Sequence, residues 1–135
     1  MTIALQYTNV TVNDVDESIA FYGGALGLEV QNDVASGDFR WVTLGSGSQP
    51  GLGIVLSEPH AGRSKQDGDT MQELLVKGVL PILVFRTDDL DATFEKVRES
   101  GAEVLQEPID MGYARDCAFR DPSGNMVRIS QDPAA

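Results

Sequence analysis

The sequence has few of the residues that bind metals or form cross-links. It contains one cysteine, Cys117, and one histidine, His60, among 135 residues. A single cysteine excludes an intrachain disulfide and a CxxC metal or redox pair. A single histidine excludes an iron site that takes two histidines and a carboxylate from one chain. We therefore expect neither kind of site.

The sequence also lacks long apolar runs and an excess of positive charge. No stretch approaches the roughly 20 apolar residues that span a bilayer, and residues 1–10 show no signal-peptide pattern. We therefore expect a cytoplasmic protein without a membrane partner. The net charge is −11, with 10 basic against 21 acidic residues, and such a field repels the phosphates of nucleic acids. We expect no nucleic-acid partner.

One pattern of strand and helix occurs twice along the chain. Residues 7–12 alternate between two faces, and apolar residues then recur at helical spacing until Gly27. Residues 82–87 and the apolar positions up to Gly101 repeat this plan. The offset is 75 residues for the strands and 74 for the glycines. A nearly constant offset that carries the same elements predicts an internal repeat.

Three further strands are predicted after each helix. They cover residues 28–31, 39–44 and 52–57 in the first half, and residues 103–106, 115–120 and 126–130 in the second. Each half therefore reads βαβββ, and one such half would leave a curved sheet uncovered. We expect one α+β domain over residues 1–135, with module 1 at about 4–57 and module 2 at about 80–131. Their curved mixed sheets would surround a cleft.

Residues 58–79 lie between the modules and are too many for a simple linker. Residues 70–73 read Thr-Met-Gln-Glu, which matches a capping box, and Gly78 is placed to end a short helix. Ordered insertions of this length are often lids or binding loops. A plain crossover helix is an equally good interpretation.

Four motifs in a fixed order point to a known family. They are DVDESIAFY at 14–22, LGLE at 26–29, DDLD at 88–91 and DPSGN at 121–125. With the paired βαβββ halves, they resemble the glyoxalase/bleomycin-resistance/extradiol-dioxygenase group, the vicinal-oxygen-chelate superfamily. The resemblance covers about residues 4–130, without a clear counterpart for 58–79. A shared fold of this kind carries many functions.

The resemblance implies four metal-ligand positions, which metal-dependent members fill with His, Glu or Gln. In this chain they are occupied by Tyr7, Val55, Ile82 and Arg128. Valine and isoleucine have no donor atom, and arginine stays protonated at neutral pH. A lone tyrosine does not anchor a divalent transition metal. We therefore expect no metal at this site and no cofactor.

Strand alternation predicts which side chains face the cleft. Cys117 shares the core face of Phe119, which indicates a buried, inert thiol, and His60 lies in a polar loop where only Asp67 and Asp69 could join it. The cleft faces are predicted to carry Tyr7, Asn9, Trp41, Val55, Ile82, Arg86, Asp116 and Arg128.

Two of these predictions leave alternatives open. Trp41 is a stacking platform for a planar ligand or a contact between subunits. In one interpretation, Arg86 and Arg128 hold an anionic oxygen of a ligand. In the other, an arginine pairs with Asp116 inside the protein.

Two classes of function fit this site. The favoured one is a metal-free small-molecule binding protein, similar to the antibiotic-sequestering members of the family, which capture a ligand in a cleft between two chains. We therefore expect a small organic ligand and a homodimer. The alternative is a metal-free isomerase or lyase acting on a carbonyl compound, with Tyr7 as proton donor and Arg128 or Arg86 stabilising an oxyanion. Asp116 is the only acid on the predicted cleft faces, so a base is poorly supplied.

Overall fold

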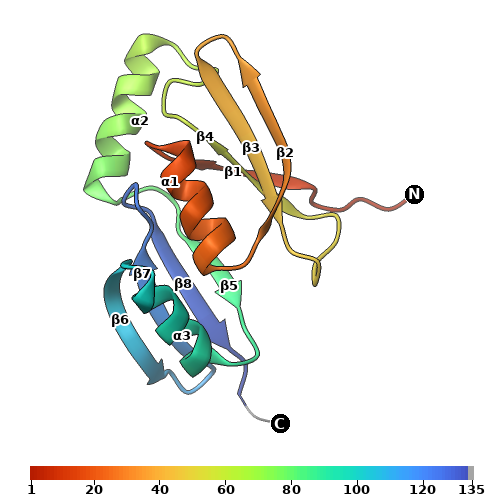
Figure 1. The fold of residues 1–135 in the computed structure, drawn as a ribbon, viewed down its shortest axis with the longest axis vertical. Helices are drawn as coiled ribbons and strands as arrows, with labels where there is room; N and C mark the ends of the chain where they lie inside the picture. The colour runs from red at the N-terminus through yellow and green to blue at the C-terminus, as the bar shows by residue number, and fades with distance from the viewer. Residues whose placement is uncertain (134–135) are drawn as a thin grey trace.

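The computed structural model describes residues 1–133, and each half of the chain forms its own four-stranded sheet (Figure 1). The first sheet has the order β1-β4-β3-β2, and the second has the equivalent order β5-β8-β7-β6. In both, the first and last strands of the module are parallel and the other pairs are antiparallel. The strands are β1 (Tyr7–Thr11), β2 (Glu29–Ser36), β3 (Phe39–Gly45), β4 (Gly53–Ser57), β5 (Leu83–Arg86), β6 (Glu103–Asp110), β7 (Arg115–Arg120) and β8 (Met126–Gln131). The two predicted βαβββ modules are confirmed.

The helix of each module is followed by the glycine that the sequence predicts as its end. The helices are α1 (Val15–Ile19), which continues as a π-helical turn over Ala20–Ala25, and α3 (Leu90–Glu99). Asp14 and Asp89 cap them, accepting from backbone N–H groups three residues later at 2.9 and 3.1 Å. Gly27 and Gly101 follow them with φ of 80° and 95°, a left-handed conformation that a residue without Cβ adopts freely.

The helix between the modules starts earlier than predicted. α2 spans Lys65–Lys77, and its N-cap is Ser64, whose hydroxyl accepts from the Asp67 N–H at 3.1 Å. The prediction of a capping box at Thr70 is therefore wrong. Thr70 lies inside the helix, and its hydroxyl donates to the Gln66 carbonyl. The first turn of α2 is polar, so apolar periodicity did not reveal it. Gly78 ends the helix as predicted, with φ of 73°.

Two strands are longer than predicted for a similar reason. β2 runs on to Ser36 and β6 to Asp110. Both strands lie at a sheet edge, carry many exposed polar side chains and contain a register shift, at Val30/Asn32 and at Val104/Gln106. A bulge interrupts the two-residue alternation from which strands are recognised in a sequence.

One apolar core runs through both modules. In Figure 1, α1 lies against the first sheet and α3 against the second. The fully buried side chains are Val12, Tyr22, Val42, Leu44 and Leu56 from the first module, and Leu90, Val97, Cys117, Phe119, Val127 and Ile129 from the second. Burying each large apolar side chain stabilises the fold by about 1.5–3 kcal/mol. The modules therefore stabilise each other through their helix-covered faces.

Asp121 joins the two modules by hydrogen bonds. Its Oδ1 accepts from three backbone N–H groups of its own turn, each at 2.9 Å. Its Oδ2 accepts from the Tyr22 hydroxyl at 2.7 Å and from the Asn125 amide at 2.9 Å. Asn125 also donates to the Thr11 carbonyl at 2.9 Å. The DPSGN turn of the second module is thereby fastened to β1 and α1 of the first.

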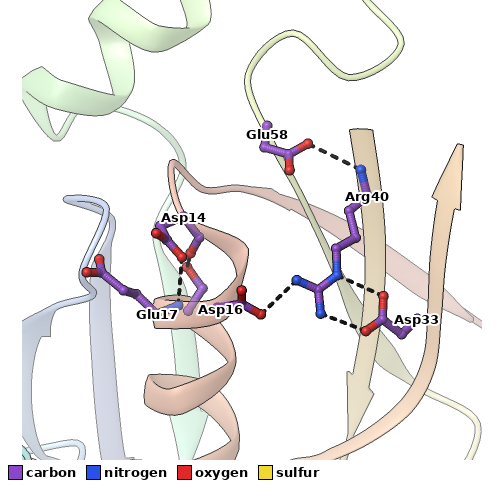
Figure 2. A network of polar contacts seen from close by, with 7 residues as sticks. Asp14, Asp16, Glu17, Asp33, Arg40 and Glu58 are labelled. Carbon is purple, nitrogen blue, oxygen red and sulfur yellow. Dashed lines mark hydrogen bonds and ion pairs between the residues drawn. The ribbon is translucent and has the colours of Figure 1, made fainter. Parts of the chain in front are cut away.

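An ion pair is repeated in the two modules at the same 75-residue offset. Figure 2 shows Arg40 of β3 bound to Asp16 in α1 at 2.7 Å and to Asp33 on β2 at 2.7 Å. In the second module, Arg115 of β7 binds Asp91 in α3 at 3.0 Å. Each pair ties the start of a helix to the third strand of its module. The repeat thus includes tertiary contacts as well as elements.

Candidate functional site

The first sheet has a face that α1 does not cover. Tyr7 and Asn9 of β1 are exposed there, Tyr7 at 49%. Strand register places Val55 of β4 beside Asn9. Trp41 of β3 is half-buried and adjoins Val42, which is fully buried in the core, so the Trp41 side chain lies on the opposite face. The structure therefore gathers Tyr7, Asn9, Trp41 and Val55 on one open face.

The second sheet has an equivalent open face. Register places Arg128 of β8 between Val84 of β5 and Ala118 of β7. Asp116 lies one step along β7 on the same face, because a strand alternates with a period of two. Ile82 directly precedes β5 and is 51% exposed. Ile82, Asp116 and Arg128 are thus associated with this second face.

Arg128 and Asp116 form a closed polar cluster with Gln106. Arg128 Nε donates to Asp116 Oδ2 at 2.9 Å, and Nη2 donates to Asp116 Oδ1 at 3.2 Å and to Gln106 Oε1 at 3.0 Å. Gln106 Nε2 returns a hydrogen bond to Asp116 Oδ1 at 2.8 Å. Asp116 is 6% exposed. Of the two interpretations of Arg128, the structure has the internal pair with Asp116.

Arg86 lies apart from this cluster. Its Nη1 is 3.6 Å from Asp132, and both side chains are more than 70% exposed. Such an exposed pair contributes little to stability. Arg86 is therefore largely exposed and makes no hydrogen bond with Asp116 or Gln106, although register places it on the face of Arg128, opposite Ser130.

A groove runs between β1 and β5, the facing edges of the two sheets. Its volume is about 1260 Å³, and among the candidate residues Asn9, Ile82 and Arg86 line it. Its apolar lining includes Leu26, Leu44, Ile54, Leu83 and Phe85. Tyr7, Trp41, Val55, Asp116 and Arg128 are not part of this lining. The structure thus divides the candidate residues among two open faces and the groove between them.

The side chains do not fit a metal site. Tyr7 and Val55 lie on the first sheet, while Ile82 and Arg128 belong to the second, and together they supply one phenol and one cation. Within residues 1–133, no three His, Cys, Asp or Glu side chains are grouped so that they could hold a metal ion.

No helix in this part of the chain is both long and apolar enough to cross a membrane.

His60 has a partner that the sequence left undecided. Its Nε2 lies 2.8 Å from Asp69 Oδ1, and Lys65 Nζ lies 2.7 Å from the other oxygen of the same carboxylate. Lys65 and then His60 lower the pKa of Asp69 below its ordinary value. Of the two acids that the sequence offers, Asp67 and Asp69, the structure pairs His60 with Asp69, because α2 starts early enough to bring Asp69 to the loop.

Cys117 is buried and unreactive, as predicted. Its side chain has no exposed surface, and burial raises its pKa to about 11, with a smaller contribution from Asp116. A thiol with this pKa is almost entirely protonated at neutral pH and is a poor nucleophile.

Gln106 is the residue of this region that the sequence did not reveal. Strand pairing places it opposite Ala118, on the face of Arg128. The bulge after Val104 shifts the alternation there, so a regular two-residue period assigns Gln106 to the wrong face. In the sequence, the one signal for Gln106 is that a polar residue stands next to an apolar residue in a predicted strand.

Known proteins resemble this chain over almost its whole length. A model of the Glyoxalase/Bleomycin resistance protein/Dioxygenase superfamily matches residues 4–129. Uncharacterized protein YurT of Bacillus subtilis is 30% identical, over 92% of this chain and 95% of its own. A probable lactoylglutathione lyase of Synechocystis is 28% identical, with 94% of each chain covered.

Two solved structures have the same fold. UcmS2 superposes with a TM-score of 0.86 at 31% identity, covering 96% of this chain and 98% of its own. TnmS3, an antibiotic binding protein from Streptomyces sp. CB03234, superposes with a TM-score of 0.77 at 25% identity, covering 98% and 99%. The likeness therefore includes the whole of both modules.

Proposed function

Since the chain belongs to the glyoxalase/bleomycin resistance/dioxygenase superfamily, we propose that it binds a planar organic molecule and releases it unchanged. The observation that carries the proposal is the open face of the first sheet. There Trp41 of β3 offers an aromatic surface, and Tyr7 and Asn9 of β1 offer polar groups farther along the same face. Small-molecule sites commonly combine an aromatic wall with a few polar groups that orient the ligand. The similarity to TnmS3 supports the same class of function.

Lyase chemistry receives less support from these residues, although some relatives are named lactoylglutathione lyases. The four family ligand positions hold one phenol, two aliphatic side chains and a guanidinium. A metal-free reaction would need a general base near the ligand. Asp116 is the candidate acid residue of the open faces, and both of its oxygens accept hydrogen bonds from Arg128. Engaged in this way, it is a poor base.

We further propose that a second copy of the chain completes the cleft. β1 and β5 are edge strands, and the side chains of Tyr7, Ile82 and Val84 are 49%, 51% and 62% exposed near them. Exposed apolar groups along unpaired edges favour association. A two-fold dimer would cover these groups and close the open faces over a ligand.

Trp41 provides the test of ligand binding, because it is the only tryptophan. Planar aromatic compounds that bind on this face should quench its fluorescence. Trp41→Ala should weaken binding of such a compound by roughly 1–3 kcal/mol, the usual loss of a stacking aromatic, as measured by calorimetry. Trp41→Phe should retain part of the affinity.

A change in the recovered ligand would contradict the proposal. If mass spectrometry finds that the compound is transformed, and Tyr7→Phe abolishes the transformation, the protein is an enzyme. Tyr113→Phe is the matched control, since Tyr113 is a highly exposed tyrosine at 73%.

A further inference from the structure

The open face of the second sheet carries a guanidinium whose charge is already balanced. Arg128 uses Nε and Nη2 to bind Asp116 and Gln106. Within residues 1–133, the remaining nitrogen, Nη1, has a hydrogen bond only to the Met126 sulfur, at 3.8 Å. Sulfur is a weak acceptor. Arg128 therefore presents one available pair of donor hydrogens and, together with Asp116, no net charge.

The open face of the first sheet has no charge at its centre. Register aligns Asn9, Val55, Thr43 and Asn32 in one row across the four strands, and Trp41 adjoins that row. The charged residue that register places on this face is an acid, Glu29, beside Gly45 at the end of β3. A negative ligand would find hydrogen-bond donors there but no opposite charge.

An anionic ligand would face two penalties at this site. The protein as a whole has a net charge of −11, which repels anions as they approach. To form a salt bridge with Arg128, the anion would have to share or displace Asp116, and a buried carboxylate without its partner is strongly unfavourable. A neutral carbonyl or hydroxyl oxygen accepts from Nη1 without disturbing the pair.

We infer that Asp116 makes the site select uncharged planar ligands over anionic ligands of the same shape. This inference rests on the proposed binding function and on the proposed dimer, in which the face that carries Trp41 and the face that carries Arg128 close over one ligand. It adds the chemical class of that ligand. Asp116 acts as a specificity-determining residue through Arg128: it neutralises the guanidinium and leaves Nη1 to bind a neutral acceptor. Gln106 holds both partners and keeps the pair in place.

Two matched probes test the selectivity. Methyl 2-naphthoate is neutral, and 2-naphthoate has nearly the same shape and is anionic at pH 7. We expect the unaltered protein to bind the ester at least about tenfold more tightly than the anion, as measured by calorimetry and by Trp41 quenching. Asp116→Asn should raise the affinity for naphthoate at least about tenfold, because Arg128 is then free to bind it. Affinity for the ester should change by less than about threefold.

A control variant separates this effect from a change in net charge. Asp91→Asn removes one negative charge and frees Arg115, on the helix-covered side of the sheet. It should leave the ratio of the two affinities as in the unaltered protein. Circular dichroism and a thermal melt check that each variant is folded, and Asp116→Ser, whose hydroxyl still accepts from Arg128, replaces Asp116→Asn if the latter does not fold.

The outcomes distinguish the inference from the proposed function. If the unaltered protein binds both probes equally, or a folded Asp116 variant leaves their ratio unchanged, the inference is wrong while ligand binding stands. If neither probe binds to any folded variant, the binding function itself is contradicted.

Discussion

The carboxylate of Asp121 contacts residues from both halves of the chain. It accepts five hydrogen bonds, and one of them comes from the Tyr22 hydroxyl, which is fully buried. Burial, followed by the charge of Asp121, raises the pKa of Tyr22 well above its usual value, so the hydroxyl is protonated at neutral pH and donates to Asp121. A buried hydrogen bond to a charged group is among the stronger single contacts in a protein.

Tyr22→Phe should therefore destabilise the protein. It removes the donor to Asp121 Oδ2 while keeping the ring in the core, so the expected loss is about 1.5–3 kcal/mol of unfolding free energy in urea denaturation. Tyr113→Phe is the control, and at 73% exposure it should change stability by less than about 0.5 kcal/mol. Equal effects of the two substitutions would show that the contact with Asp121 adds nothing.

Arg128 shows how one residue's role depends on a neighbour. From the sequence, Arg128 was a ligand-binding cation or the partner of Asp116. The two-residue period of β7 and β8 put both side chains on one face, but it does not say which atoms meet. The distance of 2.9 Å between Arg128 Nε and Asp116 Oδ2 shows that the pair is formed.

At the scale of elements, α2 has two candidate N-cap residues, one from the structure and one from the sequence. Ser64 caps the helix in the structure, and Thr70 lies within it. Ser64→Ala should cost about 1 kcal/mol of stability through the lost cap. Thr70→Ala should be neutral or slightly stabilising, because alanine is the better residue inside a helix. If Thr70→Ala were the more harmful of the two, the helix would begin at the capping box that the sequence indicated.

The repeated ion pair predicts a dependence of stability on pH. Arg115 lowers the pKa of Asp91, and Arg40 lowers that of Asp33. A carboxyl whose pKa is lower in the folded state stabilises the fold above its unfolded pKa of about 4, and the contribution disappears as the pH falls further. The urea midpoint should therefore decrease below about pH 4, and part of this decrease should be absent in Asp91→Asn.

Arg115→Gln removes the other partner of the same pair. It should lose the same part of the pH dependence as Asp91→Asn, because either substitution abolishes the contact. The effect is small, since both side chains are exposed to solvent and their interaction is screened. Different profiles for the two variants would mean that another group interacts with Asp91.

At the scale of the molecule, we expect a dimer with a mass twice 14.5 kDa. Light scattering at micromolar concentration measures it, and Val84→Glu on β5 should shift the protein toward the monomer by placing a charge at the covered edge. Val76→Glu on α2 is the control, because Val76 is similarly exposed, 67% against 62% for Val84. A monomer at micromolar concentration would contradict the proposed cleft between two copies.

The sequence by itself determined the repeated module and its order of elements. Local signals carried this: aspartates that cap α1 and α3, glycines that follow them, and a two-residue period in the strands. Each of these signals acts within a few residues, so it can be recognised from the sequence alone. The same signals failed where the pattern was polar or bulged, at the start of α2 and at the ends of β2 and β6.

Only the tertiary structure decided which side chains meet. The contacts of Tyr22 with Asp121 and of Arg128 with Gln106 join residues 99 and 22 positions apart. The division of the candidate residues between two open faces and a groove depends on how the two sheets are placed. No local pattern records such distances, because they arise when the modules bury their helix-covered faces against each other and leave the opposite faces open.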